Sequence, residues 1–186
     1  MSVAAAIENS LLGGQDRRPR RMRKNGCIVV GIGNPLMGDD GVGIEVAKAV
    51  KKLNLGRSVL VLERQIMDIS VLDSAEGASK LVIVDAVKSG RPPGSVVKFR
   101  AGGPLSPVLR LPTSHEQNLH DILTLARKSG MHPPPTVVVG VEPADCTPGK
   151  GLSKDVTGAL PRVLKEVRDE VKECARRGAA SPTMTF

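Results

Sequence analysis

The sequence predicts an α/β protein, a three-layer sandwich in which helices flank a twisted, mostly parallel sheet. Short aliphatic runs alternate along the chain with stretches in which apolar residues recur at helical spacing, an order typical of such folds. The chain has no Trp or Tyr and only two Phe, so its core must be built from Val, Leu, Ile and Ala. Its 186 residues suffice for one domain with a full core.

The first part of the pattern predicts three strands and two helices. Continuous aliphatic runs, typical of strands buried on both faces, place the strands at Cys27–Ile32, Val59–Leu62 and Leu81–Val84. Between them, apolar residues recur at the spacing of a helix face, which predicts helices over 42–53 and around Met67–Ala78.

The second part adds two strands and two helices. Val alternates with polar residues over Ser95–Arg100, which predicts an edge strand with one wet face. Apolar spacing predicts a helix over 119–126, and the run Thr136–Val141 a last strand. We expect the C-terminal helix to run from Leu160 to Arg177, with Pro161 in its first turn, where a missing amide donor costs nothing.

We divide the chain into a flexible basic tail (1–26), one domain (27–177) and a frayed C-terminus (178–186). The tail holds six basic and two acidic side chains, so it carries +4 of the formal net charge of +8. The remaining charge forms no basic helix face, and the aromatic residues on which bases stack are almost absent. We therefore expect no nucleic-acid binding, and we expect the tail to be dispensable for chemistry.

The cysteines and the lengths of the apolar segments indicate a cytoplasmic protein. Cys27, Cys146 and Cys174 are odd in number and lack C-x-x-C spacing, which argues against a disulfide framework or a structural zinc site. No apolar segment has the length of a signal peptide or a membrane span. We expect a monomer in the cytoplasm that does not associate with membranes.

Acidic residues follow two of the predicted strands. Ligands of an open parallel sheet bind at the carboxyl ends of its strands, where this chain has Asp39 and Asp40 after the first strand and Asp85 after the third. One aspartate suffices to cap the following helix, which leaves the other to point into the crevice. Asp85 emerges from a buried strand, so a cation or a hydrogen-bonding loop must compensate for its desolvation.

A histidine joins these carboxylates at the same edge. Ser114 and Gln117 have the spacing of a capping box, which places His115 in the first turn of a helix, where the dipole keeps its ring neutral as a metal ligand must be. One histidine and two carboxylates make a three-ligand site for a divalent metal with open positions. The spacing does not choose among nickel, zinc, iron and manganese, nor between metal-activated hydrolysis and metal recognition.

The glycines after the first strand also suggest a dinucleotide-binding loop. Gly31-Ile32-Gly33 begins like that fingerprint, and Glu63 ends the second strand, but Leu36 stands where the third glycine is needed. Gly41 and Gly43 instead allow another backbone to approach the start of the helix, and a peptide tail is one such backbone.

Three segments resemble the motifs of the nickel-iron hydrogenase maturation endopeptidases. The family's long signature is similar to the run Gly31-Ile32-Gly33-Asn34-Pro35-Leu36-Met37-Gly38-Asp39-Asp40-Gly41-Val42-Gly43. Its two other motifs resemble Val82-Ile83-Val84-Asp85-Ala86 and the pair Ser114-His115 followed by Leu119. The resemblance covers about residues 27–175 in the family's order.

The resemblance implies a mainly parallel sheet flanked by helices and an endopeptidase that removes the C-terminal extension of the hydrogenase large-subunit precursor after nickel insertion. The family's acidic residues and histidine fall on Asp40, Asp85 and His115, as catalytic residues and metal ligands that the resemblance does not separate. Asp39 then keeps the capping role. The nickel is the precursor's own, bound by the precursor's cysteine thiolates, and other divalent metals can occupy the site in the isolated protein.

The chain departs from the family pattern after the second strand. Many members have an acidic-Gly-Gly sequence there, whereas this chain has Glu63-Arg64-Gln65-Ile66-Met67. A glutamine at this place makes the chain resemble a subgroup of the family. The sequence does not identify which hydrogenase is processed. We expect five residues to bind the substrate, namely Gly33, Asn34, Gly41, Gly43 and Gln65.

Two other functions remain as alternatives. A nickel-binding maturation chaperone without peptidase activity would use Asp40, Asp85 and His115 but leave the precursor's length unchanged. A nucleotide-binding enzyme would be stabilised against heat by NAD or ATP and be indifferent to Asp85. Within the peptidase hypothesis, the lack of a G-x-S-x-G or paired Cys-His motif argues against a covalent route, which leaves a carboxylate base or a metal-activated water.

Overall fold

The computed structural model describes residues 26–101 and 114–179, and the side chains of residues 26–101 and 119–176. In this part of the chain, five strands form one sheet, in which only the edge strand β4 runs antiparallel to its neighbour. The predicted edge strand and the mostly parallel sheet are thereby confirmed. The order across the sheet is β2 (Val59–Arg64), β1 (Cys27–Ile32), β3 (Lys80–Ala86), β5 (Thr136–Val141) and β4 (Val96–Arg100).

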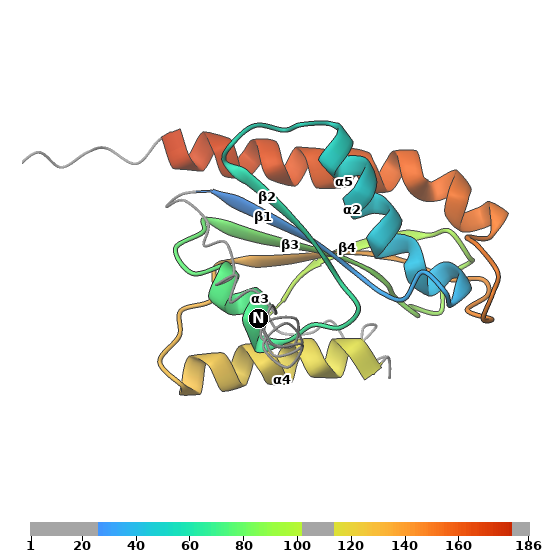
Figure 1. Ribbon diagram of the computed structural model, residues 1–186, viewed down its shortest axis with the longest axis horizontal. Helices are drawn as coiled ribbons and strands as arrows, with labels where there is room; N and C mark the ends of the chain where they lie inside the picture. Colours follow the sequence, from blue (N-terminus) through green and yellow to red (C-terminus); the bar gives the residue numbers. More distant parts are fainter. Residues whose placement is uncertain (1–25, 102–113, 180–186) are drawn as a thin grey trace, which may run out of the picture.

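Helices cover both faces of the sheet, as Figure 1 shows. One face carries α2 (Val42–Lys52) and α5 (Lys154–Ala179), and the other carries α3 (Ile69–Ser74) and α4 (Ser114–Lys128). A short 3-10 turn, η1 (Gly38–Gly41), joins β1 to α2. The three-layer sandwich is therefore confirmed. Of the helices that the structure describes, none combines the length and the apolar character needed to span a membrane.

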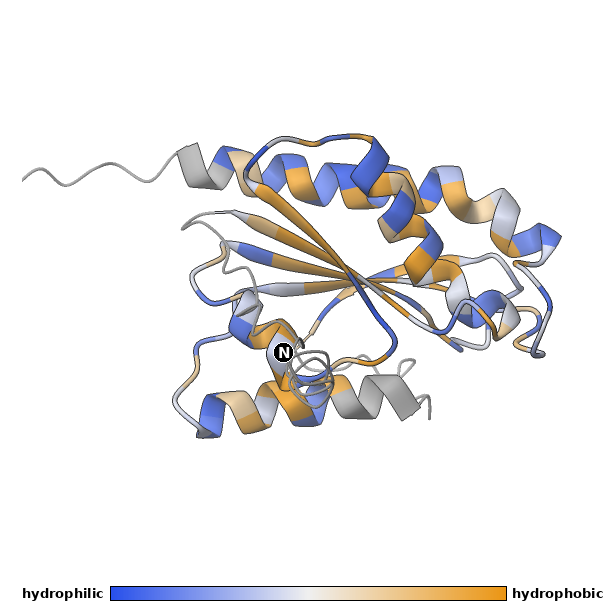
Figure 2. Ribbon diagram, in the orientation of Figure 1, coloured by the Kyte–Doolittle hydropathy of each residue, from blue (hydrophilic) through white to orange (hydrophobic). Residues whose placement is uncertain are grey.

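Successive residues of the central strands fill two separate cores, because their side chains point to opposite faces. Val29 and Val82 pack with α2 and α5, whereas Ile28 and Ile83 pack with α3 and α4. Figure 2 shows the apolar strands enclosed between helices whose outward faces are polar. Burial on both faces explains why these strands read as continuous aliphatic runs.

Helix α3 is shorter than the sequence pattern predicts. Asp68 caps α3, since its Oδ1 accepts hydrogen bonds from the amides of Ser70 at 2.8 Å and Val71 at 3.3 Å. Gly77 then turns the chain with a φ of 77°. The helix consequently ends at Ser74 instead of continuing to Ala78.

The C-terminal helix begins earlier than predicted. The Oγ of Ser153 accepts a hydrogen bond from the Val156 amide at 3.3 Å, and α5 starts at Lys154 rather than Leu160. Pro161 therefore lies inside the helix and not in its first turn, which corrects the prediction. Its exposed position on α5 keeps the ring out of the core.

The order of the strands reverses between β1 and β3. From β1 the chain passes through α2 to β2 on one side, and from β2 it returns through α3 to β3 on the other side. Ligands of open α/β sheets bind beyond the carboxyl ends of the strands at such a switch point. The fold thus directs attention to the carboxyl ends of β1 and β3.

Candidate functional site

Asp40 lies on η1, directly after the carboxyl end of β1. Its Oδ2 accepts a hydrogen bond of 2.7 Å from the Asn34 amide, which folds the loop back on itself. The side chain is half-buried, and η1 packs against β3. A Cβ on Gly43 would lie 2.1 Å from the Ile32 carbonyl oxygen and 2.3 Å from that of Val84. The chain after Asp40 therefore touches the ends of both strands.

The glycines of this loop make room for the chain's own backbone. Gly33 has a φ of 133°, and a Cβ there would lie 1.8 Å from the carbonyl oxygen of Asp40. A Cβ at Gly41 would lie 2.7 Å from the backbone of the loop before η1. The close backbone approach expected at Gly41 and Gly43 is thus made within the chain, and a role of either residue in substrate binding stays a prediction.

Asp85 lies near the end of β3, next to β1. It is only 5% exposed, and its Oδ1 accepts a hydrogen bond of 2.8 Å from the Ala86 amide. Side chains alternate along a strand, so Asp85 lies on the face of Leu81 and Ile83, which is the face covered by α3 and α4. A buried carboxylate therefore stands at the switch point on the α4 side of the sheet.

His115 is the second residue of α4, and its side chain lies outside the described residues. Figure 1 shows that α4 begins at the end of the molecule where the parallel strands finish, as the sequence predicts. Among the described side chains, no group of three metal-ligating residues occurs. Because His115 is not among them, the convergence of Asp40, Asp85 and His115 stays a prediction.

Asp39 does not cap the helix, contrary to the sequence-based expectation. It is fully buried, and its carboxylate accepts three backbone hydrogen bonds, from Ala144 at 2.8 Å, Asp145 at 3.0 Å and Ser153 at 2.6 Å. The N-cap of α2 is Gly41, without a side-chain bond. Burial alone would raise the pKa of Asp39, but these amide donors together lower it. We call this arrangement the Asp39 clamp.

Sequence reasoning missed Cys146, which the Asp39 clamp holds beside Asp40. The loop after β5 is fixed to η1 by the clamp and by a 2.9 Å bond from the Asp39 amide to the Asp145 carbonyl. Burial raises the pKa of the Cys146 thiol, the Asp40 carboxylate raises it further, and Lys88 opposes both. The signal for Cys146 is its place beyond the carboxyl end of the last strand.

Glu142 was also missed, and it orders the neighbouring loop. It is 7% exposed, and its Oε2 accepts hydrogen bonds of 2.6 Å from both the amide and the hydroxyl of Ser89. The Arg91 amide donates to the same oxygen at 3.4 Å. The loop that follows β3 is thereby fixed to the end of β5.

The end of β2 lies beside the end of β1, where the Gly33 amide donates a 3.1 Å hydrogen bond to the Arg64 carbonyl. Glu63 accepts a hydrogen bond of 2.6 Å from Lys51, so the carboxylate that a dinucleotide-binding protein would turn toward a ribose is paired with α2. Gln65 and Ile66 are exposed in the following loop. The role of Gln65 in substrate binding stays a prediction.

The fold and this edge define a doubly wound α/β protein with acidic side chains at its switch point. Residues 44–170 match the family model HycI, hydrogenase maturation protease. The chain therefore belongs to the hydrogenase maturation protease family. The matched residues include β3 with Asp85 and α4 with His115, and they exclude the glycine-rich run before residue 44. The family is thus established independently of the long signature.

Relatives align along most of the chain. A putative hydrogenase maturation protease of Methanocaldococcus jannaschii, MJ0253, is 28% identical over 164 residues, which cover 82% of this chain and 100% of the relative. The hydrogenase expression/formation protein HoxM of Cupriavidus necator is 26% identical over 161 residues, or 82% of this chain and 71% of HoxM. The hydrogenase 2 maturation protease of Escherichia coli is 26% identical over 148 residues, which cover 78% of this chain and 90% of that protease.

Solved structures agree with this assignment. The hydrogenase maturating endopeptidase HybD from Escherichia coli superposes with a TM-score of 0.66 and 25% identity over 80% of this chain and 93% of HybD. A hydrogenase 2 maturation peptidase from a Thaumarchaeota archaeon gives a TM-score of 0.60 and 26% identity, over 79% of this chain and 98% of that peptidase. The predicted fold class and family are confirmed, and the chain is a peptidase.

Proposed function

We propose that this protein removes the C-terminal extension of a nickel-iron hydrogenase large-subunit precursor after nickel insertion, using Asp40, Asp85 and His115. Family membership supports the reaction and the class of substrate, since the relatives are hydrogenase maturation proteases. The observation that carries the site is the pair of carboxylates at the carboxyl ends of two neighbouring strands, Asp40 on η1 after β1 and Asp85 near the end of β3.

The hydrogen bonds of the two adjacent aspartates support Asp40 as the metal ligand. Both oxygens of Asp39 are occupied by backbone amides. Asp40 uses Oδ2 for the Asn34 amide, and no described residue donates a hydrogen bond to its Oδ1. An anionic oxygen is therefore available at Asp40 for a cation, whereas Asp39 has the structural role.

The donor set suits the nickel of the precursor. Carboxylate oxygens from Asp40 and Asp85 and a neutral imidazole from His115 are ligands that divalent nickel accepts. Three ligands leave the coordination incomplete, and the precursor's own thiolates complete it. We propose that only the complex of protease and nickel-loaded precursor assembles the whole set, so that nickel is a checkpoint for cleavage.

We propose that water is the nucleophile. It adds to the carbonyl carbon of the scissile bond, and a carboxylate of the pair takes its proton and passes it to the departing amine as the C–N bond breaks. The sequence lacks the motifs of covalent serine and cysteine peptidases. The peptidase is therefore of the aspartic or metal-dependent type in this proposal.

Processing of the large subunit in cells tests the proposal. A strain without this protein should accumulate precursor that is longer by its extension, and Asp85→Asn or His115→Ala should lower processing by a factor of about 100 or more. Glu45→Gln, which alters an exposed carboxylate paired with Lys48 on α2, is the matched control and should process normally. Mature-length subunit in the strain without this protein would favour the chaperone alternative.

A further inference from the structure

A pocket lies at the opposite end of the sheet from the candidate site. Its volume is about 180 Å³, and it lies between the starts of β1 and β2 and the second half of α5. Cys27 begins β1 and lines this pocket, whereas Ile32 ends the strand beside the candidate site. A strand rises about 3.3 Å per residue, so these two ends of β1 are roughly 16 Å apart.

Two cysteines face each other in the wall of this pocket. Cys27 on β1 and Cys174 on α5 lie close enough together for Cys174 to raise the pKa of the Cys27 thiol, although 147 positions separate them in the sequence. Neither is part of a disulfide; they are 2% and 1% exposed, and both line the pocket. The pocket is therefore the route by which a small molecule can reach them.

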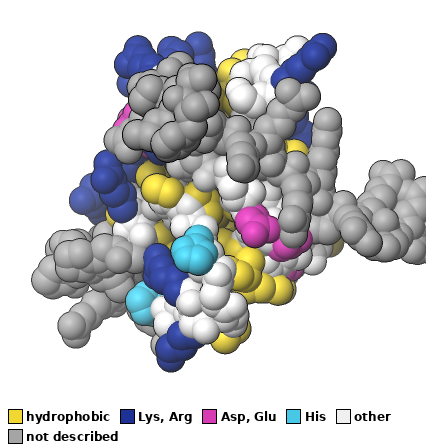
Figure 3. Space-filling model, turned by 90° about the vertical axis from the view of Figure 1, so that its left-hand side faces the viewer, with side chains coloured by type: hydrophobic (Ala, Val, Ile, Leu, Met, Phe, Trp, Pro, Cys, Tyr) yellow, Lys and Arg dark blue, Asp and Glu magenta, His cyan; other side chains and the backbone are white. Residues whose placement is uncertain are grey.

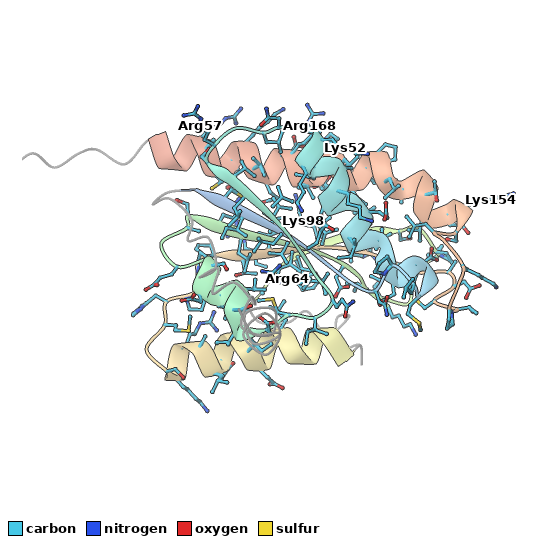
Figure 4. All side chains as sticks on the ribbon, viewed as in Figure 1. Lys52, Arg57, Arg64, Lys98, Lys154 and Arg168 are labelled. Atoms are coloured by element: carbon cyan, nitrogen blue, oxygen red, sulfur yellow. The ribbon has the colours of Figure 1, made fainter. Side chains whose placement is uncertain are left out.

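Cations stand in the same lining. Arg168 and Lys172 of α5 line the pocket together with Ser58, and no acidic residue belongs to the lining. Figure 4 shows Arg57, which precedes Ser58, and Arg168 at the same upper edge of the molecule. Figure 3 views the end at which the strands start and shows Lys and Arg side chains at its top. A small anion is thus favoured at this pocket over a cation.

We propose that this pocket is a thiol–disulfide exchange site, at which an anionic low-molecular-weight disulfide oxidises Cys27 and Cys174 to an intramolecular disulfide. One cysteine, as its thiolate, attacks a sulfur of the reagent, which forms a mixed disulfide and releases one small thiol. The second cysteine attacks the protein sulfur of that mixed disulfide and releases the other small thiol. The protein loses two electrons and two protons, and the reagent gains them as two thiols.

The environment of the pair makes this exchange slow and dependent on pH. Burial raises the pKa of the Cys27 thiol, the neighbouring Cys174 and Glu170 raise it further, and Lys80 opposes them. Attack requires the thiolate, so the rate should rise with pH. The bond would tie the first strand to the last helix across a loop of more than a hundred residues, which should raise the melting temperature by about 10 °C.

Mass spectrometry of the folded Cys146→Ser protein incubated with oxidised glutathione tests the proposal. We expect the mass to fall by two hydrogen atoms, and digestion without reductant to give one peptide pair joined through Cys27 and Cys174. Arg168→Gln with Lys172→Gln should slow the reaction with this anionic disulfide roughly tenfold while leaving that with neutral hydroxyethyl disulfide unchanged. Added salt should also slow the reaction with oxidised glutathione, because it screens the two cations.

Other outcomes overturn the proposal. If the folded protein keeps both thiols while the urea-unfolded protein is oxidised in the same time, the pocket gives no access. If a glutathione adduct forms and never resolves, the two sulfurs cannot bond. Equal effects of the charge substitutions on the two reagents would remove the role of the cations. None of these readouts depends on cleavage of a hydrogenase precursor, so they stand apart from the proposed function.

Discussion

Asp39 and Asp40 are neighbours of identical chemistry that have different tasks. The first is fully buried and saturated by three backbone amides, whereas the second is half-buried and keeps one oxygen without a described donor. The partners of Asp39 come from the loop after β5 and from the start of α5, more than a hundred residues along the chain. Sequence spacing cannot show such a partnership, which is why helix capping was the expectation for Asp39.

Asp39→Asn should destabilise the protein strongly. Asn has one acceptor oxygen, whereas the three backbone amides point at both oxygens of Asp39, so the NH₂ group would leave at least one buried donor unpaired, at a cost of about 2–4 kcal/mol. The free energy of unfolding in urea measures the effect. Asp121→Asn, an exposed carboxylate on α4, is the control and should change stability little. Equal stabilities of the two variants would contradict the Asp39 clamp.

Gly33→Ala should disrupt the site loop. An alanine is strained at a φ of 133°, and its Cβ would collide with the carbonyl oxygen of Asp40. Cleavage should fall well beyond any loss of stability, because the turn that carries Asp40 must move. Gly158→Ala is the matched control, since a Cβ there on α5 meets nothing within 4 Å. The free energy of unfolding of that control should rise by up to about 1 kcal/mol. Unchanged cleavage by Gly33→Ala would contradict the loop geometry.

At the scale of elements, the strands were predictable and the helix ends were not. Burial on both faces makes β1 and β3 continuous aliphatic runs, which can be recognised without tertiary knowledge. The sequence predicts too late a start for α5, because a proline is typical of a first helical turn. In the structure, Val156 and Ala159 continue the buried apolar stripe of the helix toward Ser153. Because Pro161 lies on the exposed side of α5, its ring is accommodated inside the helix.

The attachment of α5 to the sheet depends on a buried ion pair. Lys80 at the start of β3 is 2.7 Å from Glu170 and 2.8 Å from Glu173. Burial opposes both charges, but the partners together lower the pKa of Glu170 below its ordinary 4.5 and raise the pKa of Lys80 above its ordinary 10.5. The contribution of Glu170 is therefore present above pH 4.5 and lost as the pH falls through the lowered value. That of Lys80 is present below pH 10.5 and lost as the pH rises through the raised value.

Glu170→Gln should therefore cost about 1–3 kcal/mol near neutral pH. The difference from the parent should stay constant in the neutral range and shrink in acid below pH 4.5 and in alkali above pH 10.5. Urea unfolding of both proteins across this range measures it. Asp169→Asn, which breaks the exposed pair with Lys165, should cost far less, because water screens that pair. If the difference in stability between Glu170→Gln and the parent grew in acid, the lowered pKa assigned to Glu170 would be contradicted.

At the scale of the whole molecule, the two ends of the sheet differ in chemistry. The carboxyl ends of the parallel strands gather Asp40, Asp85, Glu142 and the loop of Cys146, whereas the starts hold the cysteine pocket and the Lys80 ion pair. The carboxylates could be placed from the sequence because strand ends in a parallel sheet meet at one edge. The pocket could not be predicted from the sequence, because it depends on how α5 lies across β1.

The central claim is that nickel in the precursor completes the site formed by Asp40, Asp85 and His115. The direct test offers purified enzyme the precursor with and without nickel and follows the mass of the large subunit. The account predicts that the nickel-loaded precursor is shortened by its C-terminal extension and that the nickel-free precursor keeps its full length. Equal cleavage of both forms would contradict the nickel checkpoint and leave a plain carboxylate-based or metal-hydrolytic peptidase.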